Sequence, residues 1–228
     1  MAKTTVFHLI ILDESGSMDH LKPQTVAGCN ETLNVIRSLQ SKHGDTQRNL
    51  VSIYLFQSDS EIPTRYLYKN VEIDKVKNLT EGDYKPWGCT PLLDAVGSTL
   101  VDLRAVASTH EDAVANVTII TDGYENSSTD YDWHKVHRLI MQLKELGWTF
   151  NFIGANIDVE DVSKKLCIDN AMSFKATEQG TADMFNHYKH CVEASEEERI
   201  AFENVAPSMC KEERINFRKA QAGKFFKR

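Results

Sequence analysis

The feature that most constrains the fold is an unbroken apolar run near the N-terminus, residues 6–12, which ends at the acidic residue Asp13. A continuous apolar run of this length, bounded by turn residues, predicts a strand that is buried on both faces. In open α/β sheets built from such strands, ligands bind in the loops that follow the carboxyl ends of the strands. The segment that begins at Asp13 is therefore the first candidate for a functional site.

This segment carries three oxygen-bearing side chains at every second position: Asp13, Ser15 and Ser17. Gly16 lies between the two serines and allows a tight backbone turn. One carboxylate and two hydroxyls that converge on a point form a hard, oxygen-only site, which suits Mg²⁺ or Mn²⁺ better than zinc. The alternative is a helix N-cap, because Asp and Ser are common at the residue that precedes a helix.

Two further segments have the same position relative to predicted elements. Gly-Cys-Thr-Pro-Leu at 88–92 opens a helical pattern, and Thr-Asp-Gly at 121–123 ends another apolar strand. Thr90 before a proline at the first helical position is a standard helix start. As an N-cap, Thr90 would still present its hydroxyl at the mouth of the sheet, so the capping and ligand roles can coexist.

Together, the motifs Asp-x-Ser-x-Ser, Gly-x-Thr-Pro-Leu and Thr-Asp-Gly, in this order and at strand ends, resemble the von Willebrand factor type A family. The resemblance covers roughly residues 4 to 195. It implies a metal-ion-dependent adhesion site in which every position holds the expected residue type: Asp13, Ser15, Ser17, Thr90 and Asp122.

The resemblance also implies a function. The site would hold Mg²⁺ or Mn²⁺, with Ca²⁺ less favoured, and an Asp or Glu carboxylate of a partner protein would complete the metal's coordination. Small stand-alone domains of this family in bacteria and phages are often tied to stress-response or chaperone-like assemblies. Residues at the predicted rim of the site would set partner specificity: Glu14, Asp19, Trp87, Tyr124, Glu125 and Asn126.

The residues themselves leave two other functions open. A metal-dependent phosphatase of the haloacid dehalogenase type also places an Asp after its first strand, but it needs a second acid where this chain has Ser15. The sequence has no Gly-x-x-x-x-Gly-Lys-Ser/Thr phosphate loop, and His8 is expected in the core. The third possibility is a structural domain whose metal only braces the loops. We expect a binding module without catalytic activity.

Strand and helix patterns alternate along the chain, which predicts right-handed crossovers and a mainly parallel sheet. The resemblance implies a doubly wound, Rossmann-like sheet of six strands, with helices on both faces and one antiparallel edge strand at 62–71. The strands are expected at 6–12, 49–56, 62–71, 114–121, 148–154 and 171–174, and the helices at 22–42, after Pro91, and at 132–146, 159–166 and 179–196.

The composition of the 228-residue chain narrows the possible partners and location. A net charge of −7 argues against nucleic acid or an anionic membrane as the main partner. The five cysteines show no Cys-x-x-Cys spacing, and the apolar run at 6–12 leads into an acidic motif and not into a cleavage site. We therefore expect a cytoplasmic protein.

The sequence predicts a family domain over 1–196 and a charged C-terminal extension over 197–228, helical or partly disordered. Residues 193–203 hold five acidic residues and one basic residue, whereas 211–228 hold seven basic and two acidic residues. Opposite charge blocks can pair within one chain or between chains. Because Phe225 and Phe226 lie at the extreme end, where little chain follows to bury them, we expect self-association or a partner contact there.

Overall fold

The computed structural model describes residues 3–59, 61, 63–205 and 209–227. These residues form one mixed six-stranded sheet in the order β3-β2-β1-β4-β5-β6. All neighbouring strands pair in parallel except β3, which is antiparallel to β2 at one edge. The predicted fold class is thus confirmed. The strands are β1 (Thr4–Asp13), β2 (Gln47–Phe56), β3 (Arg65–Glu72), β4 (Ala113–Thr121), β5 (Thr149–Gly154) and β6 (Asn170–Ser173).

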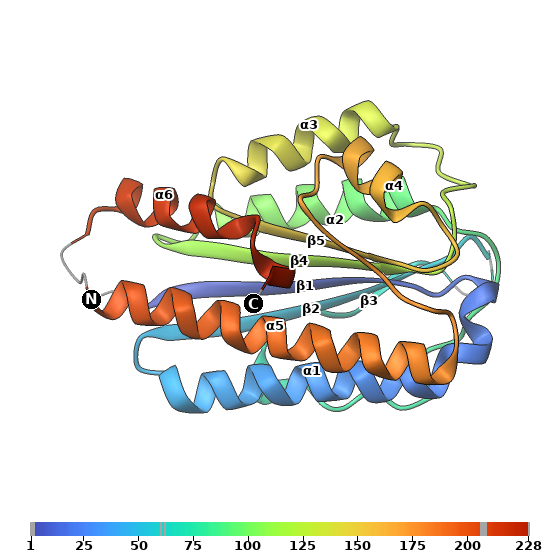
Figure 1. Ribbon diagram of the computed structural model, residues 1–228, viewed down its shortest axis with the longest axis horizontal. Coiled ribbons are helices and arrows are strands. Elements are labelled where there is room, and N and C mark those ends of the chain that lie inside the picture. The colour runs from blue at the N-terminus through green and yellow to red at the C-terminus, as the bar shows by residue number, and fades with distance from the viewer. Residues whose placement is uncertain (1–2, 60, 62, 206–208, 228) are drawn as a thin grey trace.

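Helices cover both faces of the sheet (Figure 1). Helices α2 (Leu92–Ala107), α3 (Trp133–Lys144) and α4 (Val159–Leu166) lie on one face, and α1 (Lys22–His43) and α5 (Glu178–Val205) lie on the other. The described chain also contains α6 (Lys211–Ala222) and the short 3₁₀ helices η1 (Gly16–Leu21), η2 (Ile73–Lys75) and η3 (Phe225–Lys227). None of the helices in the described part is long and apolar enough to cross a membrane.

The apolar run that begins the chain is the central strand β1, and all ten of its residues are buried. Side chains alternate between the faces of a strand, so successive residues enter different cores. Phe7, Leu9 and Ile11 pack in the core beneath α2, α3 and α4, whereas Ile10 and Leu12 pack in the core with α1 and α5. A continuous apolar run is what a strand between two covered faces requires.

The largest departures from the expected boundaries are at β3 and α5. The edge strand β3 begins at Arg65, and the expected first residue, Ile62, lies outside the described residues. Helix α5 does not end at Glu196 but continues to Val205, through the predicted domain boundary at 196. Two acids in this continuation bind buried Arg199: Glu196 Oε2 accepts from Nη2 at 2.7 Å, and Glu203 Oε2 accepts from Nη1 at 2.8 Å.

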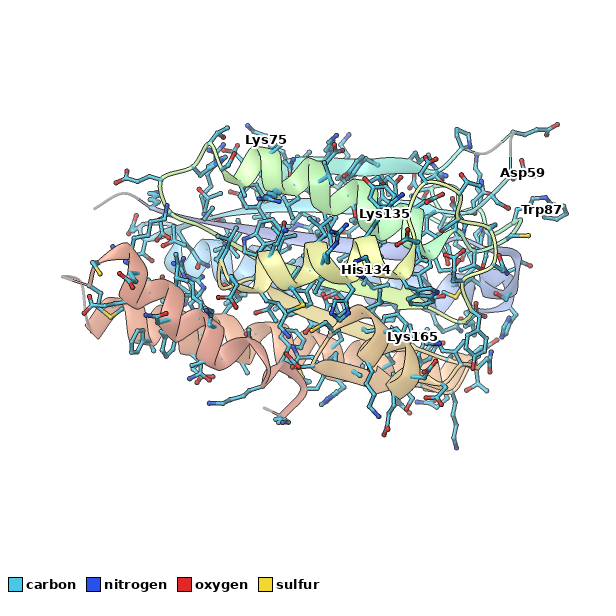
Figure 2. The ribbon with its side chains drawn as sticks, turned by 90° about the horizontal axis from the view of Figure 1, so that it is seen from above. Asp59, Lys75, Trp87, His134, Lys135 and Lys165 are labelled. Atoms are coloured by element: carbon cyan, nitrogen blue, oxygen red, sulfur yellow. The ribbon has the colours of Figure 1, made fainter. Side chains whose placement is uncertain are left out.

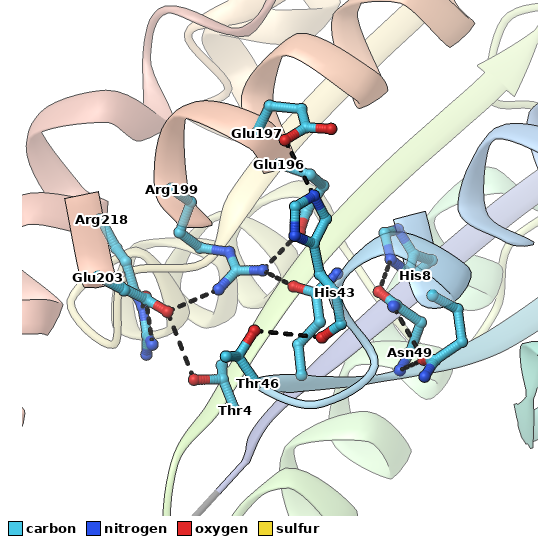
Figure 3. Close-up of polar contacts among 12 residues, drawn as sticks. Thr4, His8, His43, Thr46, Asn49, Glu196, Glu197, Arg199, Glu203 and Arg218 are labelled. Carbon is cyan, nitrogen blue, oxygen red and sulfur yellow. Dashed lines mark hydrogen bonds and ion pairs between the residues drawn. The ribbon is translucent and has the colours of Figure 1, made fainter. Parts of the chain in front are cut away.

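The segment after α5 packs on its own chain through a buried ion network, part of which is shown in Figure 3. Arg218 of α6 donates to both Asp112 (Nη1 to Oδ1, 2.8 Å) and Glu203 (Nη2 to Oε1, 2.7 Å). Arg214 adds a contact from Nη1 to Asp112 Oδ2 at 3.0 Å, and Arg199 joins the network through Glu203. The acidic and basic blocks of the sequence therefore pair within one chain. Residues 206–208 and 228 of the predicted extension lie outside the described residues.

Aromatic packing also anchors the end of the chain. Phe225 is fully buried and packs against Tyr188 of α5, with ring centroids 6.0 Å apart. Its backbone N–H donates to Asn170 Oδ1 of β6 at 3.0 Å, and the rings of Phe202 and Phe217 are stacked. The expectation of an intermolecular role rested on the short stretch of chain that follows Phe225, and for Phe225 this reason is wrong, because earlier elements of the same chain cover it.

The ion network predicts a pH dependence of stability. Burial opposes ionisation of Asp112, but the Arg218 guanidinium, with Thr4 and Arg214, more than offsets it, so the pKa of this carboxyl lies below its usual value. A folded-state pKa below the unfolded value of about 3.9 stabilises the fold above that pH, and the contribution is lost as pH falls through the folded pKa. We expect the difference in unfolding free energy between wild type and Asp112→Asn to shrink below about pH 4. Urea denaturation of both proteins across this range measures it, and a difference that does not change with pH would contradict the assignment.

Candidate functional site

The candidate site lies where β1 and β4 end side by side. Leu12 pairs with Ile120 in the parallel register, so Asp13 and the segment from Thr121 onward emerge at the same edge of the sheet. Asp13 is fully buried. Its Oδ1 accepts from the Ser15 backbone N–H at 2.7 Å, and its Oδ2 accepts from Thr121 Oγ1 at 2.5 Å. Both carboxylate oxygens are therefore held in place by the two strand ends.

The turn after β1 brings the two predicted serines to the carboxylate from the second strand. Ser17 Oγ donates to Asp122 Oδ1 at 2.5 Å and lies 3.2 Å from Ser15 Oγ. Ser15 precedes η1, but its side chain makes no capping hydrogen bond. The capping alternative therefore does not account for the Ser15 hydroxyl. The second oxygen of Asp122, Oδ2, is buried and has no hydrogen-bond partner.

Thr90 reaches the same place from the loop before α2. A Cβ atom on Gly123 would lie 3.2 Å from Thr90 Oγ1 and 4.0 Å from Ser17 Oγ, so the two hydroxyls border the same glycine. The absence of a side chain at Gly123 leaves room for this approach. The structure thus gathers all five predicted side chains at one edge of the sheet, with Thr90 placed by its proximity to Gly123.

Thr90 is not the N-cap of α2, contrary to the expected helix start. The helix begins at Leu92 with Pro91 before it, and no side chain of the capping residue bonds to the first turn. The free N–H groups of this turn are satisfied from another loop: Leu93 N donates to Glu125 Oε2 at 2.8 Å, and Asp94 N donates to Ser128 Oγ at 3.0 Å. The Thr90 hydroxyl is consequently not used in capping.

The electrostatics of the two carboxyl groups favour a cation. Burial raises the pKa of Asp13 to about 6, hydrogen bonds from Thr121 and Ser15 oppose the shift, and the charge of Asp122 adds to it. Burial also raises the pKa of Asp122. Two buried carboxylates, one with an unpaired oxygen, are costly unless a positive charge compensates them. The donor set of two carboxylates and three hydroxyls fits a hard divalent cation.

The five predicted metal ligands include no histidine and no cysteine. Within the described residues, no group of three or more His, Cys, Asp or Glu side chains is arranged to hold a metal ion. The candidate site differs from such groups because three of its five side chains are hydroxyl side chains. It is thus not a zinc site of the Cys/His type.

Part of the predicted rim has a different role. Glu14 is fully buried and forms an ion pair with Arg65, whose Nη1 lies 2.6 Å from Glu14 Oε2. Lys85 N also donates to Glu14 Oε1 at 2.5 Å. Glu14 is therefore a brace between β1, β3 and the loop before Trp87, and it cannot contact a partner. The prediction that Glu14 lies at the rim is wrong, because the sequence around a strand end does not indicate which distant side chain will cover it.

Two other rim residues brace the Thr90 loop. Asn126 Oδ1 accepts from Thr90 N at 2.8 Å, and Asn126 N donates to Thr90 O at 3.2 Å. Glu125 caps α2, as described above. Asp19, Trp87 and Tyr124 are exposed, as a rim requires.

Sequence reasoning missed two supports of the site. Thr121 donates to Asp13, and the buried Tyr84 hydroxyl donates to the backbone oxygen of Asp13 at 2.5 Å. Thr121 stands inside the Thr-Asp-Gly motif, so its position beside Asp122 was a signal for a role at the site. Tyr84 lies in a polar stretch without periodicity, and no local pattern marks it.

Comparison with known proteins identifies the fold. No family model matches the chain, and no curated protein matches its sequence. A von Willebrand factor type A protein from Catenulispora acidiphila aligns with a TM-score of 0.54 at 18% identity, over 84% of this chain and 43% of that one. The pilus adhesin SpaC from Lactobacillus rhamnosus GG aligns with a TM-score of 0.58 at 14% identity, over 83% and 30%.

A third structure, proximal thread matrix protein 1 from the mussel byssus with a zinc-occupied MIDAS motif, aligns with a TM-score of 0.50 at 14% identity, over 81% of this chain and 44% of that one. The chain spans less than half the length of each of these three proteins. Its sheet order, its antiparallel edge strand and these alignments show that the chain has the von Willebrand factor type A fold.

Proposed function

We propose that Asp13, Ser15, Ser17, Thr90 and Asp122 hold one divalent cation, Mg²⁺ or Mn²⁺, and that this cation binds a carboxylate of a partner protein. One observation carries the proposal: Oδ2 of Asp122 is buried and accepts no hydrogen bond, and it lies near a second buried carboxyl group, that of Asp13. A metal ion would supply the missing partner and offset both charges.

Charge explains why a partner carboxylate fits this metal. The two aspartates balance the charge of a divalent cation, and the three hydroxyls add only neutral oxygens. A cation held in this way remains electrophilic and retains room for a further oxygen ligand. A carboxylate is the protein group that brings both an oxygen and a negative charge.

Two similar folds are consistent with this proposal without establishing it. The mussel protein is described with zinc in its MIDAS motif, and the Lactobacillus protein is a pilus adhesin. We extend a metal-dependent adhesion role to this chain as a proposal. No disulfide joins any of the five cysteines, all of which lie in the described part of the chain. This is the state expected in a reducing compartment, and cytoplasmic localisation remains our proposal.

A binding role is favoured over catalysis by the surroundings of the site. Ser15 stands where a haloacid dehalogenase would have its second acid, and Glu14 is already paired with Arg65. His8 is buried and bonds Asn49, with Nε2 3.0 Å from Oδ1, and so is a core residue. The metal could also serve only to brace the loops. Partner binding that needs the metal would favour the binding role over this structural role.

The first test is metal binding to the purified chain. Calorimetric titration with MnCl₂ is expected to show about one site per chain. Asp122→Ala and Thr90→Ala should each weaken or abolish this binding while the protein keeps a cooperative melt, because both residues lie at element ends. Ser127→Ala, which removes a hydroxyl that has no hydrogen-bond partner, is the matched control and should bind Mn²⁺ normally.

Two results would count against this assignment. Mn²⁺ binding that is unchanged in Asp122→Ala would mean that the metal lies elsewhere. A loss of more than about 4 kcal/mol of stability in either variant would mean that these residues are structural first.

A further inference from the structure

Two aromatic side chains beside the candidate metal site are unusually exposed. Trp87 is 63% exposed and Tyr124 is 53% exposed, the highest values among the large hydrophobic residues of the described chain. The other exposed members of this class, Val101, Met141 and Leu146, belong to α2, α3 and the turn after α3. Single exposed apolar residues need no explanation, but two aromatics that both flank one polar site do.

Both aromatics lie next to glycines that pack beside the serine turn. Gly16 N donates to Gly88 O at 3.2 Å, and a Cβ on Gly16 would lie 3.9 Å from the carbonyl carbon of Trp87. Tyr124 follows Gly123, which borders Ser17 and Thr90. Figure 2 shows Trp87 projecting outward at one end of the molecule, near Asp59. The two aromatics are therefore neighbours of the loops that carry the proposed metal ligands.

Hydrogen bonds hold the backbone of Trp87 and the ring of Tyr124. Trp87 N donates to the backbone oxygen of Glu14 at 2.8 Å, and Glu14 is itself buried by Arg65. The Tyr124 hydroxyl accepts from Asp158 N at 2.8 Å, which ties the ring to the start of α4. Anchored aromatics offer a large contact area at a low entropy cost, which is why tyrosine and tryptophan are enriched at binding hot spots.

The charges around the site restrict which residues of the partner can lie next to its acidic side chain. Asp19 is exposed in η1, directly after the serine turn. A run of acids on the partner would be repelled by this carboxylate, whereas one acid can be neutralised at the metal. The large exposed apolar side chains next to the site are those of Trp87 and Tyr124.

We propose that the partner is a protein segment with a single Asp or Glu next to a large apolar or aromatic side chain, which packs on Trp87 and Tyr124 while the acid binds the metal. This inference rests on the proposed metal-dependent function. It goes further by naming the residues outside the metal set that select the partner.

A phage-displayed library of random dodecapeptides tests this inference. The library is selected on the immobilised full-length protein with Mg²⁺ present, and bound phage are released with a chelator. We expect released peptides to share one acid with a large apolar residue within two positions. Synthetic copies should bind Trp87→Ala and Tyr124→Ala at least about tenfold more weakly than wild type, as hot-spot truncations do. Met141→Ala, which truncates an exposed apolar residue on α3, should bind them normally.

Other outcomes would overturn the inference. They are released peptides whose acid has no apolar neighbour, peptides rich in several acids, or equal binding by wild type and Trp87→Ala. Calorimetry with MnCl₂ on each variant distinguishes a failure of the metal site from a failure of the aromatic contact. If wild type binds Mn²⁺ and no peptide is enriched, the aromatic contact is wrong while the metal site stands. If wild type binds no Mn²⁺, the proposed function fails, and this inference fails with it.

Discussion

Arg218→Ala is expected to lower the free energy of unfolding by about 3–5 kcal/mol, the usual cost of removing one partner from a buried ion pair. The Arg218 side chain is buried, and it is shared by two acids, Asp112 and Glu203, that are themselves mostly covered. Its removal leaves both carboxylates with less compensation in a place that water reaches poorly. Urea denaturation at neutral pH measures the change.

Lys219→Ala is the matched control because it removes the next residue of the same helix. Lys219 pairs with Glu145 across 2.5 Å, but both side chains are solvent-exposed, so the expected cost is under about 1 kcal/mol. Equal effects of the two substitutions would mean that α6 contributes to stability without the buried network. A small effect of Arg218→Ala would mean that the buried ion network contributes little to stability.

Asp13→Ala is expected to weaken Mn²⁺ binding by at least about 100-fold, more than the loss usually seen when an outer-shell partner of a metal ligand is changed. The substitution removes one of only two carboxylates in the proposed set, so the divalent charge would be poorly compensated. Calorimetric titration with MnCl₂ measures the affinity.

Two variants make this result specific. Asp19→Ala removes an exposed carboxylate from the same turn and should bind Mn²⁺ nearly as tightly as wild type. Asp13→Asn keeps an oxygen for the Ser15 N–H and should preserve the fold better than Asp13→Ala, which leaves that N–H without its acceptor. Unchanged affinity in Asp13→Asn and Asp13→Ala would remove Asp13 from the site.

Local chemistry made the burial of β1 and the convergence of the polar motifs predictable. A run that is apolar at every position must be buried on both faces, which places β1 in the interior of a covered sheet. The polar motifs at 13–17 and 121–123 follow apolar strands directly, and parallel strands end at the same edge. Their convergence therefore follows from the alternation of strands and helices.

Capping was less predictable, because it depends on which loop reaches a helix end. Thr90 and Pro91 have the sequence of a standard helix start, yet Glu125 and Ser128 from a distant loop satisfy the first turn of α2. Several side chains can satisfy the same N–H group, and their competition is decided by the distance between loops. A propensity averaged over many proteins does not contain that distance.

Residue type and short-range periodicity are enough to predict the α/β class, the burial of β1 and the set of polar side chains at the strand ends. Packing between distant segments makes Glu14 a buried brace and not a rim residue, because Arg65 comes to it from β3. Packing of the same kind folds the C-terminal segment onto its own chain. Asp112, Glu203 and Arg218 are far apart in sequence, and a charge pattern states which groups can pair but not which ones the packed helices and strands bring together.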